Sequence, residues 1–129
     1  MRKIAVFTGT RAEYHLLRPL LTLMQKSEQL QLQLIVSAMH LSPEYGYTLT
    51  RITEDGFIPA ANIETLLSSD TAVGTLKSMG LGLLGYADAL ERLKPDMLLL
   101  AGDRTETLAA AQCGLILQIP IFHLHGGEI

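Results

Sequence analysis

The chain has 129 residues and a mass of 14.1 kDa, a length that fits one domain. Hydrophobic residues make up 48% of it, enough to build a core, so wholesale disorder is excluded. The formal net charge is −3 and no basic block occurs, which argues against a nucleic-acid partner. A single cysteine, Cys113, excludes an internal disulfide framework and a thiolate zinc cluster.

The N-terminus begins with Met1-Arg2-Lys3 and continues with apolar residues, as a signal peptide does. Its apolar run ends at Phe7, which is too short for a secretory hydrophobic region. No stretch approaches the roughly 20 apolar residues that span a bilayer. We therefore expect a soluble, cytoplasmic protein without a membrane partner.

Short apolar runs alternate with segments of helical period, and most runs end in a loop rich in Gly, Thr, Ser or Asp, which indicates successive β-α-β units. The predicted strands cover residues 3–8, 33–38, 57–62, 97–101 and 119–124. Strands separated by helices in this order imply a parallel sheet with right-handed crossovers. The sequence thus predicts one Rossmann-like or flavodoxin-like α/β domain over residues 1–129, cut off directly after a strand.

Helices are predicted between these strands from their apolar stripes and end signals. The stripe of the first helix consists of Leu17, Leu20, Leu21, Leu23 and Met24. Pro19 is placed near the first turn, because deeper inside it would remove a hydrogen bond. A short helix is expected at about 45–54, and a last one at about 105–117. Between them a long helix is predicted to begin at an N-cap formed by Ser69-Asp70 and to end at Lys94-Pro95. Its buried face is expected to carry Leu76, Gly80, Leu83, Ala87 and Leu90.

Ligands of open α/β sheets bind beyond the carboxyl ends of the strands, so the loops there are the candidate site. In the first loop Gly9 allows close backbone approach, and Arg11 suits a phosphate at a helix N-terminus, although a surface ion pair is the alternative. The G-x-G-x-x-G fingerprint is absent, so no dinucleotide is indicated. His40 follows the second strand, where a capping or hydrogen-bonding role competes with catalysis.

The loop after the fourth predicted strand places Asp103 to cap the last helix, with Glu106 completing a capping box. A catalytic carboxylate is the alternative for Asp103. After the fifth strand, His123 and His125 face the same side by strand alternation. They could bind a metal, but only Asp103 or Glu128 could be a third ligand, so acid/base chemistry is favoured and no metal is predicted.

Together these loops resemble the hydrolysing UDP-N-acetylglucosamine 2-epimerases of sialic acid biosynthesis and their relatives that act on UDP-diacetylbacillosamine. The matching stretches are TGTRAEY at 8–14, SAMHLSPEYG at 37–46, SMGLGL at 78–83, RLKPD at 92–96, GDRTE at 102–106 and IPIFHLHGGE at 119–128. The resemblance implies a two-domain, glycosyltransferase-B-like enzyme nearly three times this length. The 129 residues would be its N-terminal Rossmann-like domain, without the C-terminal nucleotide-binding domain and inactive alone.

The implied reaction eliminates UDP from the sugar nucleotide and hydrates the glycal-like intermediate, without a cofactor, in an intact enzyme that is a homo-oligomer. The resemblance assigns binding of the substrate to Gly9, Thr10, Arg11, His40, Gly102 and Arg104. It assigns catalysis to Asp103 together with His125 or Glu128. Some relatives have H-x-E where this chain has H-x-H, so His125 is favoured by position and Glu128 is the alternative.

Two other functions remain to be weighed. The same reaction on UDP-diacetylbacillosamine would feed legionaminic acid synthesis and differs from the first in its sugar. A non-catalytic nucleotide-binding or response-regulator-like domain is the alternative from another class. Such receivers need an acidic cluster after the first strand and an aspartate after the third, and neither is found in this sequence.

Overall fold

The computed structural model describes residues 1–37, 48–64, 71–102 and 104–124. Five parallel strands form one sheet with the order β3-β2-β1-β4-β5. Their bounds are β1 Arg2–Thr8, β2 Leu30–Ser37, β3 Ala61–Ile63, β4 Met97–Ala101 and β5 Ile121–Leu124. Because β1 lies between β2 and β4, the order is that of a Rossmann half and excludes the flavodoxin-like order, in which β1 adjoins β3.

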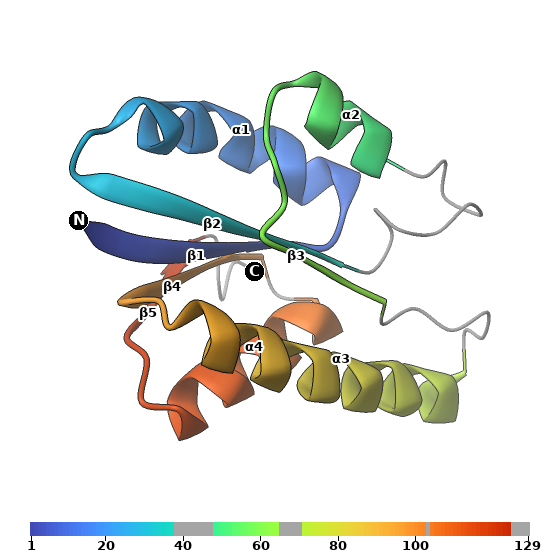
Figure 1. The fold of residues 1–129 in the computed structure, drawn as a ribbon. Coiled ribbons are helices and arrows are strands. Elements are labelled where there is room, and N and C mark those ends of the chain that lie inside the picture. Colours follow the sequence, from blue (N-terminus) through green and yellow to red (C-terminus); the bar gives the residue numbers. More distant parts are fainter. Residues whose placement is uncertain (38–47, 65–70, 103, 125–129) are drawn as a thin grey trace.

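Helices cover both faces of the sheet (Figure 1). One face carries α1 (Arg11–Lys26) and α2 (Leu49–Glu54), and the other carries α3 (Ala72–Leu93) and α4 (Thr105–Ile116). In the described residues, no helix is long and apolar enough to cross a membrane.

The core forms two apolar layers, one on each side of the sheet. The layer under α1 and α2 contains Val6, Tyr14, Leu17, Leu21, Met24, Leu34, Val36, Ile52, Phe57, Leu99 and Ala101. The layer under α3 and α4 contains Ala5, Phe7, Ile35, Ile63, Tyr86, Ala89, Leu90, Leu98, Leu100, Ala109, Ala110 and Cys113. Successive residues of the central strands enter opposite layers, which explains their continuous apolar sequences.

The first helix departs from the sequence prediction at two positions. Pro19 lies well inside α1 and not in its first turn, on an exposed part of the helix. Proline has no N–H to donate, so the backbone carbonyl four residues earlier loses its helical hydrogen bond. Because this part of the helix is exposed, water can donate to that carbonyl instead. Leu23 was assigned to the apolar stripe, but its side chain is 68% exposed, whereas Leu17, Leu21 and Met24 are buried.

The long helix α3 begins at Thr71, whose Oγ1 accepts a hydrogen bond from the Gly74 N–H at 3.0 Å. The cap predicted at Ser69-Asp70 falls outside the described residues, and Thr71 occupies the N-cap position instead. The predicted buried face is also wrong in part, because Leu76 and Ala87 are exposed. The residues buried from this helix are Gly74, Gly82, Tyr86, Ala89 and Leu90.

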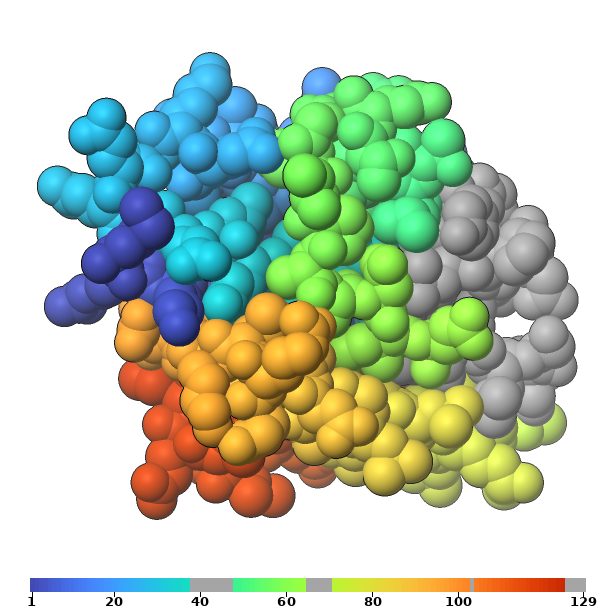
Figure 2. Space-filling model, in the orientation of Figure 1, coloured from blue at the N-terminus to red at the C-terminus, as the bar shows by residue number. Residues whose placement is uncertain are grey.

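The two edge strands are shorter than, or shifted from, the predicted ones. The third covers Ala61–Ile63 and not 57–62, because Phe57 turns into the core under α2 instead of pairing. The fifth begins at Ile121, two residues later than predicted. Figure 2 shows that residues 48–64 (green) cover the β3 side of the molecule between α1 and α3.

Candidate functional site

The strand order reverses between β1 and β4, the two strands paired through Ile4 with Met97 and Val6 with Leu99. After β1 the chain enters α1 on one face, and after β4 it enters α4 on the other. The two connections therefore diverge at the carboxyl edge of the sheet. In open α/β sheets this divergence forms the crevice where ligands bind.

The loop after β1 begins α1 with a well-formed N-cap. Thr10 has extended backbone angles (φ −139°, ψ 159°), and its Oγ1 accepts the Glu13 N–H at 3.3 Å. The Gly9 N–H donates to Glu13 Oε1 at 2.5 Å. Gly9 and Thr10 are both buried, and they lie next to the positive end of the helix dipole of α1.

Arg11 is the first residue of α1 and is exposed beside this loop. The sequence left a surface ion pair open as its alternative role. Within the described parts of the chain, Arg11 forms no ion pair with a carboxylate. At the N-terminus of α1, an anion would gain both the charge of this guanidinium and the backbone donors of the helix.

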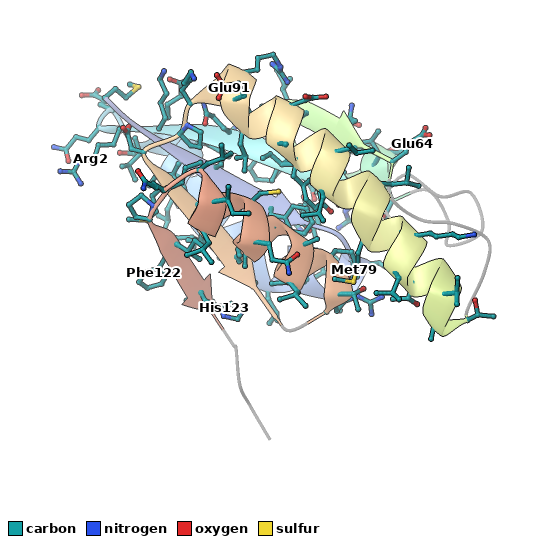
Figure 3. The ribbon with its side chains drawn as sticks, turned by 90° about the horizontal axis from the view of Figure 1, so that it is seen from below. Arg2, Glu64, Met79, Glu91, Phe122 and His123 are labelled. Carbon is teal, nitrogen blue, oxygen red and sulfur yellow. The ribbon has the colours of Figure 1, made fainter. Side chains whose placement is uncertain are left out.

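The loop after β4 depends on Gly102, which has φ +83° and therefore takes a conformation that side chains disfavour. Its N–H donates to the Leu124 carbonyl at 2.9 Å, and its own carbonyl contacts His123 Nε2 at 2.5 Å. The β4 and β5 ends are thereby joined. Figure 3 shows His123 next to Phe122 on β5, at the edge of the sheet.

The start of α4 is described from Arg104 onward. Arg104 occupies the N-cap position, and its side chain makes no capping hydrogen bond. Glu106 forms an ion pair with Arg104, with 3.2 Å between Oε2 and Nε. The predicted capping box needs Asp103, which lies outside the described residues. Thr107 Oγ1 donates to the Ala101 carbonyl at 3.3 Å and fixes the helix to the end of β4.

Glu13 is a site residue that sequence reasoning missed. Its side chain is only 7% exposed, and burial raises the pKa of its carboxyl to about 7. Hydrogen bonds with Gly9 and Thr8 and the charge of Arg104 favour the ionised form, while Glu106 opposes it. The signal was present in the sequence, because Thr10-x-x-Glu13 is a capping-box pattern.

The predicted site is thus described in part. Gly9, Thr10 and Arg11 lie at the end of β1, and Gly102 and Arg104 at the end of the adjacent β4. The other predicted residues, His40, Asp103, His125 and Glu128, lie outside the described residues. Among the residues that are described, no group of three or more His, Cys, Asp or Glu side chains could hold a metal ion.

A protein-family model described as UDP-N-acetylglucosamine 2-epimerase matches residues 22–129, which is most of the chain. The chain belongs to this family. A Campylobacter jejuni member, named GDP/UDP-N,N'-diacetylbacillosamine 2-epimerase (hydrolyzing), is 43% identical over 99% of the chain. A Legionella pneumophila UDP-N,N'-diacetylbacillosamine 2-epimerase (hydrolyzing) is 42% identical over the same share. The chain spans about a third of the length of these two relatives, 33% and 34% respectively.

Solved structures of the 2-epimerase family share the fold. The crystal structure of UDP-GlcNAc 2-epimerase from Neisseria meningitidis bound to UDP-GlcNAc has a TM-score of 0.80 at 23% identity. It matches 99% of this chain, which corresponds to 33% of that structure. The predicted Rossmann-like fold and the resemblance to the N-terminal part of a 2-epimerase are therefore confirmed.

Proposed function

We propose that this chain is the N-terminal Rossmann-like domain of a hydrolysing UDP-sugar 2-epimerase. The observation that supports this proposal is the reversal of strand order between β1 and β4, which is the switch point of the sheet, in a chain that belongs to the 2-epimerase family. At that point the N-terminus of α1 presents Gly9, Thr10 and Arg11 beside the loop that begins with Gly102. Backbone donors, a helix dipole and a guanidinium suit a diphosphate leaving group.

In the proposed reaction the bonds from C2 to hydrogen and from C1 to the UDP oxygen break, giving UDP and a glycal. Water then adds, with its hydroxyl to C1 and a proton to C2 on the opposite face, so atoms and electrons balance without an oxidant or cofactor. Asp103 and His125, or Glu128 in place of His125, would move the protons. Gly102, Arg104 and His40 would contact the substrate, and Arg11 would stabilise the departing diphosphate.

Sequence identity favours UDP-N,N'-diacetylbacillosamine as the sugar nucleotide. Two relatives named for that sugar are 43% and 42% identical to the chain. The Neisseria meningitidis UDP-N-acetylglucosamine 2-epimerase is 34% identical over a similar length. UDP-N-acetylglucosamine is the second candidate, because that protein also aligns with the whole chain.

The test is UDP release from each sugar nucleotide by the whole gene product that carries this chain. We expect UDP from UDP-N,N'-diacetylbacillosamine with a higher kcat/KM than from UDP-N-acetylglucosamine. The sugar product formed in deuterated water should carry one deuterium, at C2. The reverse preference would assign the chain to UDP-N-acetylglucosamine, and no UDP from either nucleotide would contradict the proposed function.

Substitutions test the proposed roles in the same assay. Asp103→Asn should abolish UDP release, while Asp88→Asn on the exposed side of α3 should retain it. His125→Ala should lose more activity than Glu128→Gln. The opposite ranking would transfer the acid/base role to Glu128, and an active Asp103→Asn variant would remove Asp103 from catalysis.

We also propose that the protein acts as a homo-oligomer in the cytoplasm. Exposed apolar side chains on the outer helices, Val73, Leu76 and Leu84 of α3 and Leu108 and Leu115 of α4, support self-association. Analytical ultracentrifugation and cell fractionation of the gene product test the two parts separately. A monomer in the ultracentrifuge would contradict the proposed homo-oligomer. Recovery with membranes would contradict the proposed cytoplasmic location.

A further inference from the structure

The residue that follows β4, Gly102, is bound to β5 through both of its backbone polar groups. Its N–H donates to the Leu124 carbonyl at 2.9 Å, just beyond the pairing of Ala101 with Leu124. Its carbonyl lies 2.5 Å from Nε2 of His123, which belongs to β5. The first bond joins two backbone groups, but the second comes from a side chain. It therefore depends on which residue stands at position 123.

The contact with the carbonyl determines which ring nitrogen of His123 has a hydrogen. A carbonyl oxygen can only accept, so Nε2 must be the donor. The neutral Nε2–H tautomer and the imidazolium both satisfy this requirement, whereas the neutral Nδ1–H tautomer does not. Because the side chain is exposed, the ring adds little apolar burial to the core. Its main contribution to this end of the sheet is the hydrogen bond.

The bound carbonyl sets the direction of the peptide that follows Gly102. This glycine has φ +83°, in a region where its backbone has more freedom than that of other residues. A trans peptide is planar, and its N–H points away from its carbonyl. Since β5 and β1 lie on opposite sides of β4, a carbonyl held towards β5 directs the N–H of the same peptide towards β1. The loop that contains Gly9 follows β1 on that side.

We propose that His123 is a positioning residue for the loop that joins β4 to α4 and acts by donating from Nε2 to the Gly102 carbonyl. This hydrogen bond turns a backbone N–H towards the crevice between β1 and β4, where the diphosphate of a sugar nucleotide would accept it. The same loop includes Asp103 and Arg104, so the bond also supports the residues assigned to catalysis and binding. The inference rests on the proposed function, which places the diphosphate at this crevice.

Two substitutions separate the hydrogen bond from the shape of the ring. His123→Phe keeps a planar ring without a donor, and His123→Gln keeps an N–H donor without the ring. In the whole gene product, His123→Phe should bind UDP about fivefold more weakly, the change that the loss of one hydrogen bond typically causes. Its affinity for uridine, which lacks the diphosphate, should be unchanged. His123→Gln should restore most of the UDP affinity.

The matched control is His15→Phe, the same substitution at an exposed position of α1, and it should keep the wild-type affinities. A structural role alone would lower the stability of His123→Phe and leave the ratio of UDP to uridine affinity unchanged. An unchanged ratio would therefore overturn the inference. So would a His123→Gln variant that binds UDP no better than His123→Phe.

A second experiment uses the wild type alone, so it does not depend on whether the variants fold. In the whole gene product labelled with ¹⁵N at histidine, glycine and aspartate, the neutral His123 ring should have its hydrogen on Nε2. UDP should shift the backbone amide of Asp103 more than that of Gly102, and uridine should shift neither. A hydrogen on Nδ1 alone, or an Asp103 amide that UDP leaves unmoved, would overturn the inference.

The inference and the proposed reaction can fail separately. If UDP shifts the Asp103 amide but no sugar nucleotide releases UDP, the inference is supported and the proposed reaction is rejected. If the wild type releases UDP and His123→Phe has the same UDP affinity as the wild type, the reaction is supported and the inference is rejected.

Discussion

The Tyr14 hydroxyl donates a hydrogen bond to Asp55 Oδ2 at 2.6 Å and so links α1 to the residue that ends α2. Arg18 and Arg51 also lie near this carboxylate, with nitrogens 3.5 Å and 3.4 Å from Oδ1. The Tyr14 hydrogen bond is the largest cause that lowers the pKa of Asp55. A residue with a lowered pKa in the folded state stabilises the fold above its unfolded-state pKa, and loses that contribution as pH falls through the folded-state value.

Tyr14→Phe should therefore reduce the free energy of unfolding at pH 7 by about 1.5–3 kcal/mol, the usual range for a hydrogen bond to a charged group. The loss should shrink as pH falls below about 4, because a protonated Asp55 no longer depends on the hydroxyl. Urea unfolding monitored by circular dichroism at pH 7 and pH 3 measures both values. Arg51→Gln removes only a half-exposed ion pair and should cost less than about 1 kcal/mol. A larger loss for Arg51→Gln than for Tyr14→Phe would contradict this explanation.

Single residues were predicted well where local chemistry decides their role and poorly where partners come from far away. Gly102 was assigned to a strand-end loop and adopts the positive φ that only glycine tolerates easily. The Thr10-x-x-Glu13 pattern indicates a capping role for Glu13, but the closeness of its carboxyl to Gly102 at the end of β4 is a long-range feature that no local pattern reveals.

At the level of elements, α3 packs closely against β3 at one point. A Cβ built on Gly85 would clash with Ile63 Cγ2, whereas one on Gly80 of the same helix would meet no atom within 4 Å. Close packing against the sheet therefore accounts for the glycine at position 85 and not for the one at position 80.

The two glycines form a matched pair of variants. Gly85→Ala should destabilise the protein by about 1–3 kcal/mol through overpacking, even though alanine is the better helix former. Gly80→Ala should stabilise it by up to about 1 kcal/mol, because only the helix propensity changes. Thermal unfolding of both variants measures the difference. Equal effects of the two substitutions would show that α3 does not pack against β3 at this position.

Elements with a strong apolar pattern were predicted closely, and those with a weak or ambiguous pattern were not. The strand at Met97–Ala101 has the predicted bounds, because its run is apolar throughout and ends at glycine. Along α3, apolar residues lie all around the helix, so periodicity could not choose between Leu76, which is exposed, and Tyr86, which is buried. Tyr86 packs edge-on against Phe7 with ring centroids 5.0 Å apart, a long-range contact that fixes the helix rotation.

For the whole molecule, the alternation of strands and helices predicted a parallel α/β fold but not the order of its strands. Rossmann-like and flavodoxin-like sheets share this alternation and differ only in which strand lies beside β1. Pairing of β1 with both β2 and β4 decides between them and places the switch point between β1 and β4. The loops that the sequence singled out after these two strands consequently adjoin, which is why the candidate site extends over both.

Titration of the isotopically labelled chain with UDP, followed by amide NMR, tests most directly whether this edge of the sheet binds the nucleotide. We expect shifts at Gly9, Thr10, Arg11, Gly102 and Arg104, with much smaller shifts for uridine, which lacks the diphosphate. Shifts confined to the opposite edge of the sheet, around Asp96 and Gln118, would contradict it.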